Sequence, residues 1–362
     1  MFKFLAQEYV SQYGFLNLFN FITFRVGASI LTSLFFSLIF GQFIINKLSK
    51  IQPNGQPIRN DGPQTHIIKK AGTPTMGGVL IILSVFSSSV LWSDLYNSFV
   101  WIGLLALISF GFIGLIDDYN KIKSNSSNGL KAITRIILQI VFSLIISLVI
   151  LKMLDDQIDT TISFPFFKNL IINFGYFYLL ISLFILVGSA NAVNLTDGLD
   201  GLAIVPVMIV AMTFAFIAYV SGNVVFSEYL LINYIPGTGE LSVLCGALIG
   251  SALGFLWFNA PPAKVFMGDT GSLALGATLG SIALMVKHEI VLAIAGGLFV
   301  LETMSVVIQV ISFKLTGKRV FRMAPLHHHY EKKGWSEPTI VIRFWIITFV
   351  LALLSLATLK IR

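Results

Sequence analysis

Long apolar runs, separated by short polar segments, dominate the chain. Ten of these runs approach the roughly 20 residues that a helix needs to cross a bilayer. They cover about residues 23–46, 75–93, 98–117, 133–151, 175–192, 202–220, 241–258, 272–286, 290–312 and 339–359. The runs are continuous, whereas the strands of a membrane barrel would alternate over about ten residues. We therefore predict an all-α, polytopic integral membrane protein with about ten transmembrane helices.

The first 20 residues differ from these runs. They contain Glu8 and have no small-residue cleavage site before the first long run, so they lack the pattern of a signal peptide. We predict an interfacial amphipathic helix at 1–20 and a single ten-helix domain at 21–362. No internal repeat is visible, which argues against an inverted-repeat transporter.

Composition agrees with this class. The chain is 56% hydrophobic and 11% charged, whereas soluble domains carry about 25% charged residues. Its net charge is +7. We attribute this excess of basic residues to interaction with anionic lipid headgroups and to membrane orientation, and we predict no nucleic-acid partner. The single cysteine, Cys245, lies in an apolar run, which excludes an intramolecular disulfide and a cysteine-based metal site.

Basic residues are distributed unevenly between alternate loops. One set of loops holds Lys47, Lys50, Arg59, Lys69, Lys70, Lys121, Lys123, Lys131, Lys264, Lys314, Lys318, Arg319, Arg322, Lys332 and Lys333. The other set is poor in bases and holds acids such as Asp155 and Glu228. The positive-inside rule places the first set in the cytoplasm, which gives five cytoplasmic loops and two extracytoplasmic termini.

Five polar clusters fall on this predicted cytoplasmic side. They cover residues 69–78, 117–118, 191–201, 259–271 and 319–335. Polar groups beside apolar runs are costly in hydrocarbon unless they line a wet, functional surface. Scattered structural residues would not be expected to gather on one face, so we predict an active site there.

Asp117 and Asp118 close the third run. They could mark a helix end that faces water, or they could bind a divalent metal or act as base or nucleophile. Negative charge is unfavourable at a helix C-terminus, so the pair requires a counter-cation. Asp269 lies between Gly268 and Gly271, where it could be a helix N-cap or a metal ligand.

The stretch 191–201 is the most concentrated polar cluster. Asp197 and Asp200 would share a face if they were helical, and Asn194 offers an amide. A helix N-cap at Thr196 or Asp197 would explain part of the pattern. It would not account for two carboxylates and two amides, so we predict contact with a substrate.

The remaining clusters suggest anion binding. Three consecutive histidines, His327, His328 and His329, can bind phosphate when protonated, and phosphate is a better match than zinc because no further His or Cys lies nearby. Lys69 could be a membrane anchor or part of an anion site, and Phe266 could stack on a base or simply pack. Acids, lysine and histidines at a membrane surface indicate phosphoryl transfer to or from a lipid phosphate.

These segments together resemble the polyprenyl-phosphate N-acetylhexosamine-1-phosphate transferases, glycosyltransferase family 4. The resemblance rests on residues 74–78, 117–119, 191–201, 266–269 and 325–329, which span nearly the whole chain. The triple-histidine loop with Pro-Thr-Met-Gly-Gly resembles the phospho-N-acetylmuramoyl-pentapeptide transferase (MraY) branch rather than the GlcNAc-1-phosphate transferases.

The resemblance implies that UDP-MurNAc-pentapeptide and undecaprenyl phosphate react to give lipid I and UMP, with Mg²⁺, in peptidoglycan synthesis at the bacterial inner membrane. It implies Asp269 as the Mg²⁺ ligand and places Asp117 and Asp118 near the lipid phosphate, with Asp117 as base or nucleophile. The other implied catalytic residues are Lys69, His327, His328 and His329, and the implied substrate-binding residues are Thr75, Asn194, Asp197, Asp200, Asn259, Phe266 and Gln309. A homodimer is expected by analogy.

Two alternatives stay open. A UDP-GlcNAc:undecaprenyl-phosphate GlcNAc-1-phosphate transferase would share most of the motifs. A lipid or ion transporter would place its acids near the middle of the spans, whereas the acids here lie at span ends.

Overall fold

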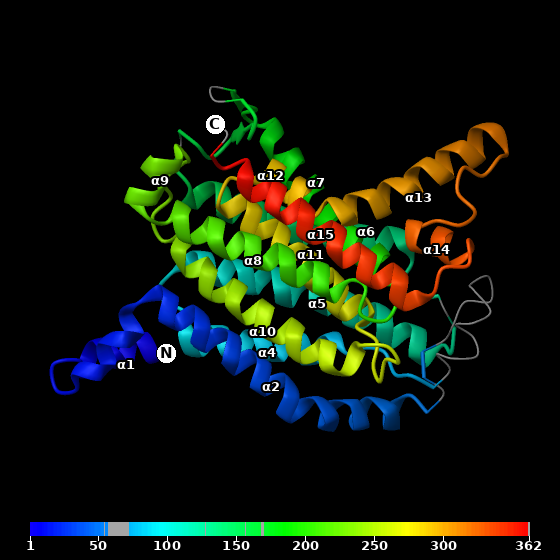
Figure 1. Cartoon of the computed structure of the whole chain (residues 1–362), viewed down its shortest axis with the longest axis horizontal. Helices are drawn as coiled ribbons and strands as arrows, with labels where there is room; N and C mark the ends of the chain where they lie inside the picture. Colours follow the sequence, from blue (N-terminus) through cyan, green and yellow to red (C-terminus); the bar gives the residue numbers. More distant parts are fainter. Residues whose placement is uncertain (54, 57–71, 127, 156, 168–169, 361–362) are drawn as a thin grey trace.

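Helices form nearly all of the regular structure of this chain. The computed structural model describes residues 1–53, 55–56, 72–126, 128–155, 157–167 and 170–360. The long helices are α2 (Ile22–Ile51), α4 (Gly78–Trp92), α5 (Ser98–Lys123), α6 (Ala132–Met153), α7 (Phe177–Thr196), α8 (Ile204–Ser221), α10 (Leu241–Asn259), α11 (Gly268–Met285), α13 (Gly297–Thr316) and α15 (Glu337–Ala357). The short ones are α1 (Phe2–Tyr9), η1 (Gly14–Asn20), α9 (Val224–Leu230), η2 (Thr238–Glu240), α12 (Glu289–Ala295) and α14 (Leu326–Glu331). The prediction of an all-α fold is confirmed (Figure 1).

One small sheet was not predicted. Strands β1 (Thr161–Ser163) and β2 (Ile171–Asn173) form an antiparallel hairpin in which Thr161 pairs with Asn173. Both strands are three residues long, which is too short for an alternating pattern to be recognised in the sequence.

Among the described residues, eight helices are long and apolar enough to cross a membrane: α2, α5, α6, α7, α8, α10 together with η2, α13 and α15. Two further predicted runs correspond to α4, which has 15 residues, and to α11. The prediction of one helix at 290–312 is wrong, because the chain divides at Gly296 into α12 and α13. Two consecutive glycines, Gly296 and Gly297, weaken a helix at that point.

Helix α11 lies at the centre of the bundle, between α4, α5, α7 and α8 (Figure 1). Every residue from Thr270 to Met285 is buried. Close packing requires small residues, and a Cβ added to Gly276 or Gly280 would lie within 2.5 Å of Ser189 on α7. This is the small-residue packing that membrane helices use to approach one another, and it explains why α11 is less apolar than its neighbours.

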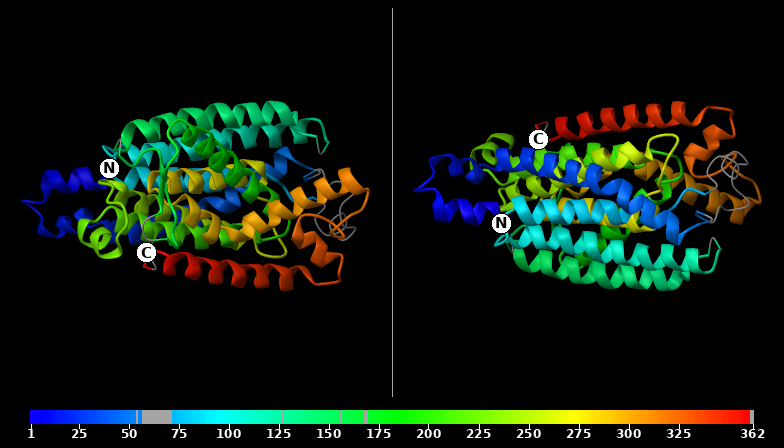
Figure 2. Two further views of the ribbon diagram at one scale, coloured as in Figure 1. Left: turned by 90° about the horizontal axis from the view of Figure 1, so that it is seen from above. Right: turned by 90° about the horizontal axis from the view of Figure 1, so that it is seen from below.

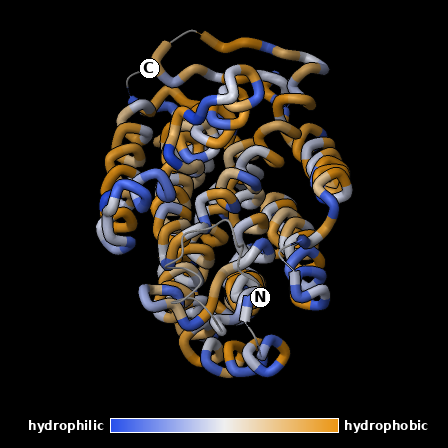
Figure 3. Tube along the Cα trace, turned by 90° about the vertical axis from the view of Figure 1, so that its right-hand side faces the viewer, coloured by the Kyte–Doolittle hydropathy of each residue, from blue (hydrophilic) through white to orange (hydrophobic). Residues whose placement is uncertain are grey.

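The two termini lie at one end of the bundle, where α1 and η1 project (Figures 1 and 2). The other end holds the last turns of α5 and α7, the first turn of α11, and α14. Figure 3 looks onto this second end and shows hydrophilic stretches among the loops in front of largely hydrophobic helices.

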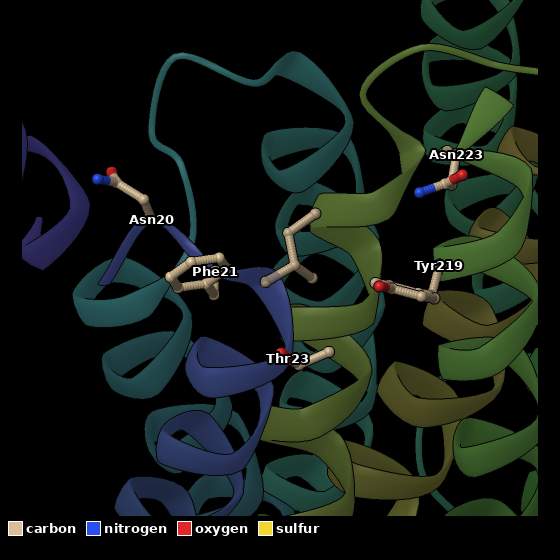
Figure 4. A pocket seen from close by; sticks show the side chains of 7 residues that line it. Asn20, Phe21, Thr23, Tyr219 and Asn223 are labelled. Atoms are coloured by element: carbon tan, nitrogen blue, oxygen red, sulfur yellow. The ribbon is translucent and has the colours of Figure 1, made fainter. Parts of the chain in front are cut away.

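The end that holds the termini is tied together by a buried ion pair. Arg25 of α2 is 1% exposed and donates to both carboxylate oxygens of Glu240 at 2.5 and 2.6 Å. Lys3 of α1 bonds to Asp94 at 2.6 Å, and Asp94 in turn donates its backbone N–H to Glu240. A pocket of about 230 Å³ also lies here, between the start of α2 and the end of α8. Figure 4 shows Asn20, Phe21, Thr23, Tyr219 and Asn223 around this pocket, none of which belongs to the predicted site.

Candidate active site

The paired acids of α5 lie inside the helix and not at its end. The helix continues to Lys123, past the boundary at 117 that the apolar run predicted. Asp117 and Asp118 are each 1% exposed, so a helix end facing water is the wrong interpretation of the pair. Buried carboxylates are stable only when they have partners, and both acids have them.

Two glycines allow the first turn of α11 to approach these acids. A Cβ on Gly114 of α5 would lie 2.1 Å from the carbonyl oxygen of Asp269, and a Cβ on Gly78 of α4 would lie 2.1 Å from the backbone nitrogen of Gly271. Only glycine leaves room for backbone this close. The two contacts set the distance between the acid pair and Asp269.

Asp118 caps α11 from a neighbouring helix. Its carboxylate accepts hydrogen bonds from the backbone N–H of Asp269 at 3.2 Å, and from the N–H and hydroxyl of Thr270 at 3.0 and 2.7 Å. A carboxylate at a helix N-terminus is favourable because unpaired N–H groups point toward it. The N-cap position itself is Met267, without a side-chain cap, so the interpretation of Asp269 as the N-cap is wrong.

Two cations that the motifs did not single out lie among the acids. The ammonium of Lys121 is 2.6 Å from Asp117 and 3.0 Å from Asp269, and Arg135 of α6 is 3.2 Å from the same Asp269 oxygen. Lys121 therefore provides the counter-cation that the acid pair requires. Its position four residues after Asp117 was the sequence signal, because residues at that spacing share a helix face.

The three acids have the donor set of a metal site. Asp117, Asp118 and Asp269 can each offer one carboxylate oxygen within 4.8 Å of the other two. Oxygen ligands suit Mg²⁺, and ligands on opposite sides of that ion lie about 4.2 Å apart. The donor set of the group therefore fits a hard divalent cation, and Lys121 and Arg135 contact the same Asp269 carboxylate.

The stretch 191–201 folds differently from its predicted helix start. Helix α7 continues to Thr196, Asp197 follows it as the C-cap, and α8 begins at Ile204. The predicted N-cap is therefore wrong, and Asp197 and Asp200 do not share a helical face. Gly201, at φ +73°, adopts a backbone conformation that favours glycine.

Two side chains of this stretch reach the segment 259–272. Asn194, on the last turn of α7, donates its amide to Asp269 and to Ser272, both at 2.8 Å. Asp200 accepts the backbone N–H of Ala263 at 3.1 Å. The stretch thus contributes the Asn194 side chain to the acid cluster and also contacts the adjoining loop.

Three of the predicted substrate-binding residues make hydrogen bonds to backbone groups of neighbouring segments. Asn259 accepts from the N–H of Gly201 at 3.0 Å and donates to the carbonyl of Val265 at 2.9 Å. Gln309 makes three bonds to the backbone of residues 320–321. The backbone of Phe266 bonds to Pro74 and to Gly77, each at 2.9 Å, and joins the loop before α4 to the loop before α11.

Thr75 is 1% exposed and lies beside the cluster. Its backbone bonds to the side chain of Gln52. A Cβ on Gly268 would lie 2.6 Å from the Thr75 hydroxyl and 2.5 Å from Asp118, so the three meet at one point. Lys69 lies outside the described residues.

The three histidines have three different environments. His327 is buried, with Nδ1 3.2 Å from Glu302, and His328 has Nδ1 2.6 Å from Glu331. The Nδ1 of His329 accepts the backbone N–H of Arg322 at 3.0 Å. Desolvation and the charges of Lys333 and Arg322 hold the pKa of His329 below its ordinary value. A neutral ring that accepts a hydrogen bond at Nδ1 does not fit the predicted protonated phosphate donor.

Comparison with known proteins gives the family. Residues 100–287 match the model of glycosyl transferase family 4, and residues 70–82 match a phospho-N-acetylmuramoyl-pentapeptide-transferase signature. A curated phospho-N-acetylmuramoyl-pentapeptide-transferase from Pelagibacter ubique (strain HTCC1062) is 58% identical over 358 residues, 99% of either chain. One from Rhodopseudomonas palustris (strain BisA53) is 55% identical over 355 residues, 98% of either chain. The chain belongs to the phospho-N-acetylmuramoyl-pentapeptide-transferase family.

Membership in this family makes the chain a transferase, and its long apolar helices make it a multi-pass membrane protein. The resemblance drawn from the motifs is confirmed, and the transporter interpretation is not needed. The carboxylate cluster can bind a metal ion.

Proposed function

We propose that this protein transfers phospho-MurNAc-pentapeptide from UDP-MurNAc-pentapeptide to undecaprenyl phosphate, giving lipid I and UMP. The observation that carries the proposal is the convergence of Asp117, Asp118 and Asp269 with Lys121 at one end of a membrane-length bundle. The names of the relatives support the choice of this donor over UDP-GlcNAc. The acceptor tail would stay in the bilayer while its phosphate reaches the end of α5.

The cluster would face the cytoplasm of a bacterial inner membrane, where UDP-sugars are available. The bases that follow the positive-inside rule support this orientation. Counting α4 and α11 as spans gives ten helices, with both termini extracytoplasmic. The exposed aromatic rings of Phe4, Tyr9 and Phe15 support an interfacial position for residues 1–20, because aromatic side chains favour the membrane–water boundary.

The reaction brings two anions together. An oxygen of the acceptor phosphate attacks the phosphorus that carries the sugar, the bond from that phosphorus to UMP breaks, and UMP leaves with the electron pair. Lys121 and Arg135 would reduce the repulsion between donor and acceptor and stabilise the charge that develops. Asp117, which accepts the Leu130 N–H and contacts Lys121, would take or hold a proton of the acceptor phosphate.

Mg²⁺ would be held by Asp269 with Asp117 and Asp118, and would neutralise the diphosphate of the donor. Asn194 and Ser272 would keep the Asp269 carboxylate oriented toward the cluster. Asp118 would keep the first turn of α11 in place. A homodimer is part of the proposal, by analogy with the family, and its mass in detergent tests it.

The test of the proposed function is a reconstituted transfer assay. Purified protein is given undecaprenyl phosphate and either UDP-MurNAc-pentapeptide or UDP-GlcNAc, with Mg²⁺ or with EDTA, and both UMP and lipid-linked sugar are measured. We expect product with the first donor only and only with Mg²⁺. Asp269→Asn should lose activity, while Asp155→Asn, at the end of the bundle that holds the termini, should keep it. Product from UDP-GlcNAc alone, or full activity of Asp269→Asn, would reject the proposal.

A further inference from the structure

Glu302 is a completely buried carboxylate in α13. A buried charge is costly unless it has partners, and both of its close partners belong to His327. The backbone N–H of His327 donates to Oε1 at 3.2 Å, and the ring Nδ1 lies 3.2 Å from the same oxygen. The second oxygen, Oε2, has no hydrogen-bond partner among the described residues. The carboxylate of Glu302 therefore contacts the first of the three histidines, His327, at both its backbone and its ring.

His327 in turn packs against the loop that follows α7. The residue is 1% exposed, and a Cβ on Gly198 would lie 2.3 Å from its Nε2. Gly198 thus leaves the space that the imidazole fills. In the part of the chain that the structure describes, neither ring nitrogen has an aligned hydrogen-bond partner.

The unpaired buried atoms of Glu302 and His327 lower the stability of the fold, which indicates that the pair is kept for a functional reason. Buried polar groups without partners are rare because each costs free energy. A carboxylate beside Nδ1 favours the tautomer that carries hydrogen there, which directs the lone pair of Nε2 toward Gly198. Three segments far apart in sequence therefore meet at one imidazole: α13, α14 and the stretch 191–201 that also carries Asn194.

We propose that Glu302 is a positioning residue for the transfer reaction. From α13 it fixes the ring of His327 over Gly198 and so holds the triple-histidine run against the stretch 191–201. The two segments then form one wall of the donor site, and the ring of His327 holds them together from behind. This inference rests on the proposed function, because it assigns the wall to the nucleotide-sugar donor.

The experiment compares donor binding and kinetics in Glu302→Ala, Glu302→Gln and His327→Ala. Calorimetry measures the Kd of UDP-MurNAc-pentapeptide, and the transfer assay gives KM and kcat. We expect Glu302→Ala to raise the donor Kd and KM at least about tenfold, the scale of one lost hydrogen bond to a charged group. Glu302→Gln should stay within about threefold of wild type, because its amide oxygen still accepts from the His327 N–H. Glu302→Ala in the His327→Ala background should add little, since coupled residues are not additive.

Gly198→Ala provides an independent arm that leaves α13 untouched. The new methyl group would displace the imidazole, so the donor KM should rise in wild type and should not rise further in His327→Ala. Ser305→Ala is the matched control, because Ser305 is buried one turn along α13 and its hydroxyl, among the described residues, bonds to the Glu302 carbonyl alone. It should leave KM unchanged.

The outcomes separate the two proposals. If the wild-type protein binds the donor but forms no product, the proposed function is rejected. The donor Kd of Glu302→Ala, compared with that of wild type, then still decides the role of Glu302. An unchanged donor Kd in Glu302→Ala, or additive effects of Gly198→Ala and His327→Ala, overturns the positioning role. Should Glu302→Ala not fold, the Gly198 arm and Glu302→Gln decide the matter.

Discussion

Gly114→Ala should lower the rate of catalysis about a hundredfold while leaving the bundle folded. Gly114 is where α5 passes the first turn of α11, and an added Cβ would lie 2.1 Å from the Asp269 carbonyl oxygen, whereas ordinary contacts begin at 3.4 Å. The neighbouring atoms are backbone and cannot rotate away. The two helices would have to separate by roughly 1 Å in a close-packed interior.

Two opposing terms decide the effect on stability. Overpacking costs about 1–3 kcal/mol, and alanine gains about 1 kcal/mol over glycine in a helix. The net change in the free energy of unfolding is then about 0–2 kcal/mol, and the protein stays folded. A misplacement of about 1 Å between catalytic groups can cost about a hundredfold in rate, because Asp269 would move away from Asp117 and Asp118. Activity should therefore fall far more than stability.

The assay measures UMP release from UDP-MurNAc-pentapeptide and, on the same samples, the thermal midpoint. Gly188→Ala on α7 is the control, because no atom of the described residues lies within 4 Å of its added Cβ. That variant should keep its activity and melt at the same temperature or slightly higher. Activity of Gly114→Ala within threefold of wild type would refute the view that this contact sets the geometry of the site.

Three other results are expected. Lys121→Met removes the ammonium group that lies among the three acids, so added Mg²⁺ should raise the thermal midpoint of this variant more than that of wild type. An equal or smaller rise would contradict the view that Lys121 and Mg²⁺ interact with the same carboxylates. Asn259→Ala leaves the buried N–H of Gly201 and the carbonyl of Val265 without partners, which costs about 1–3 kcal/mol of folding free energy for each group. Its thermal midpoint should therefore fall clearly. An unchanged midpoint would show that these bonds contribute nothing to stability. The pKa of His329 lies below its ordinary value of about 6.5. Its bond from the Arg322 N–H is therefore fully present above pH 6.5 and is lost only as the pH falls through the lower, folded-state pKa. Histidine-selective NMR should give a midpoint below 6.5, and one at or above that value would be evidence against a neutral acceptor.

The positions of the helices can be predicted from the sequence wherever hydrophobicity alone determines where a helix begins and ends. The first long run, predicted at 23–46, is α2 at 22–51, and the last, predicted at 339–359, is α15 at 337–357. Errors occur where local chemistry overrides the apolar pattern. Helix α5 extends past its apolar run because Lys121 neutralises Asp117 within the helix, and the ninth run breaks at a pair of glycines.

The residues of the site are visible in the sequence, but their roles are not. An amide beside a glycine-rich loop serves equally well for a substrate or for an unpaired backbone group. Asn259 and Gln309 look like substrate ligands in sequence, and in the structure they bond to backbone. Glu302 was overlooked, although a lone acid in the run 290–312 is itself a signal, because an isolated carboxylate is costly in an apolar environment.

The central helix shows why a polar site and an apolar bundle can coexist in one chain. Asp269 lies near the acid pair because the backbone of the first turn of α11 packs directly against α4 and α5. That packing requires glycine at positions 78 and 114 and small residues along α11. Those small residues make α11 too weakly apolar to resemble a lipid-facing span, so it is stable only when other helices enclose it, as they do from Thr270 to Met285. The composition that makes α11 the least convincing membrane helix in the sequence is therefore the composition that the acid cluster needs. In such a chain, the helix with the weakest hydropathy signal is the one to inspect first for catalytic residues.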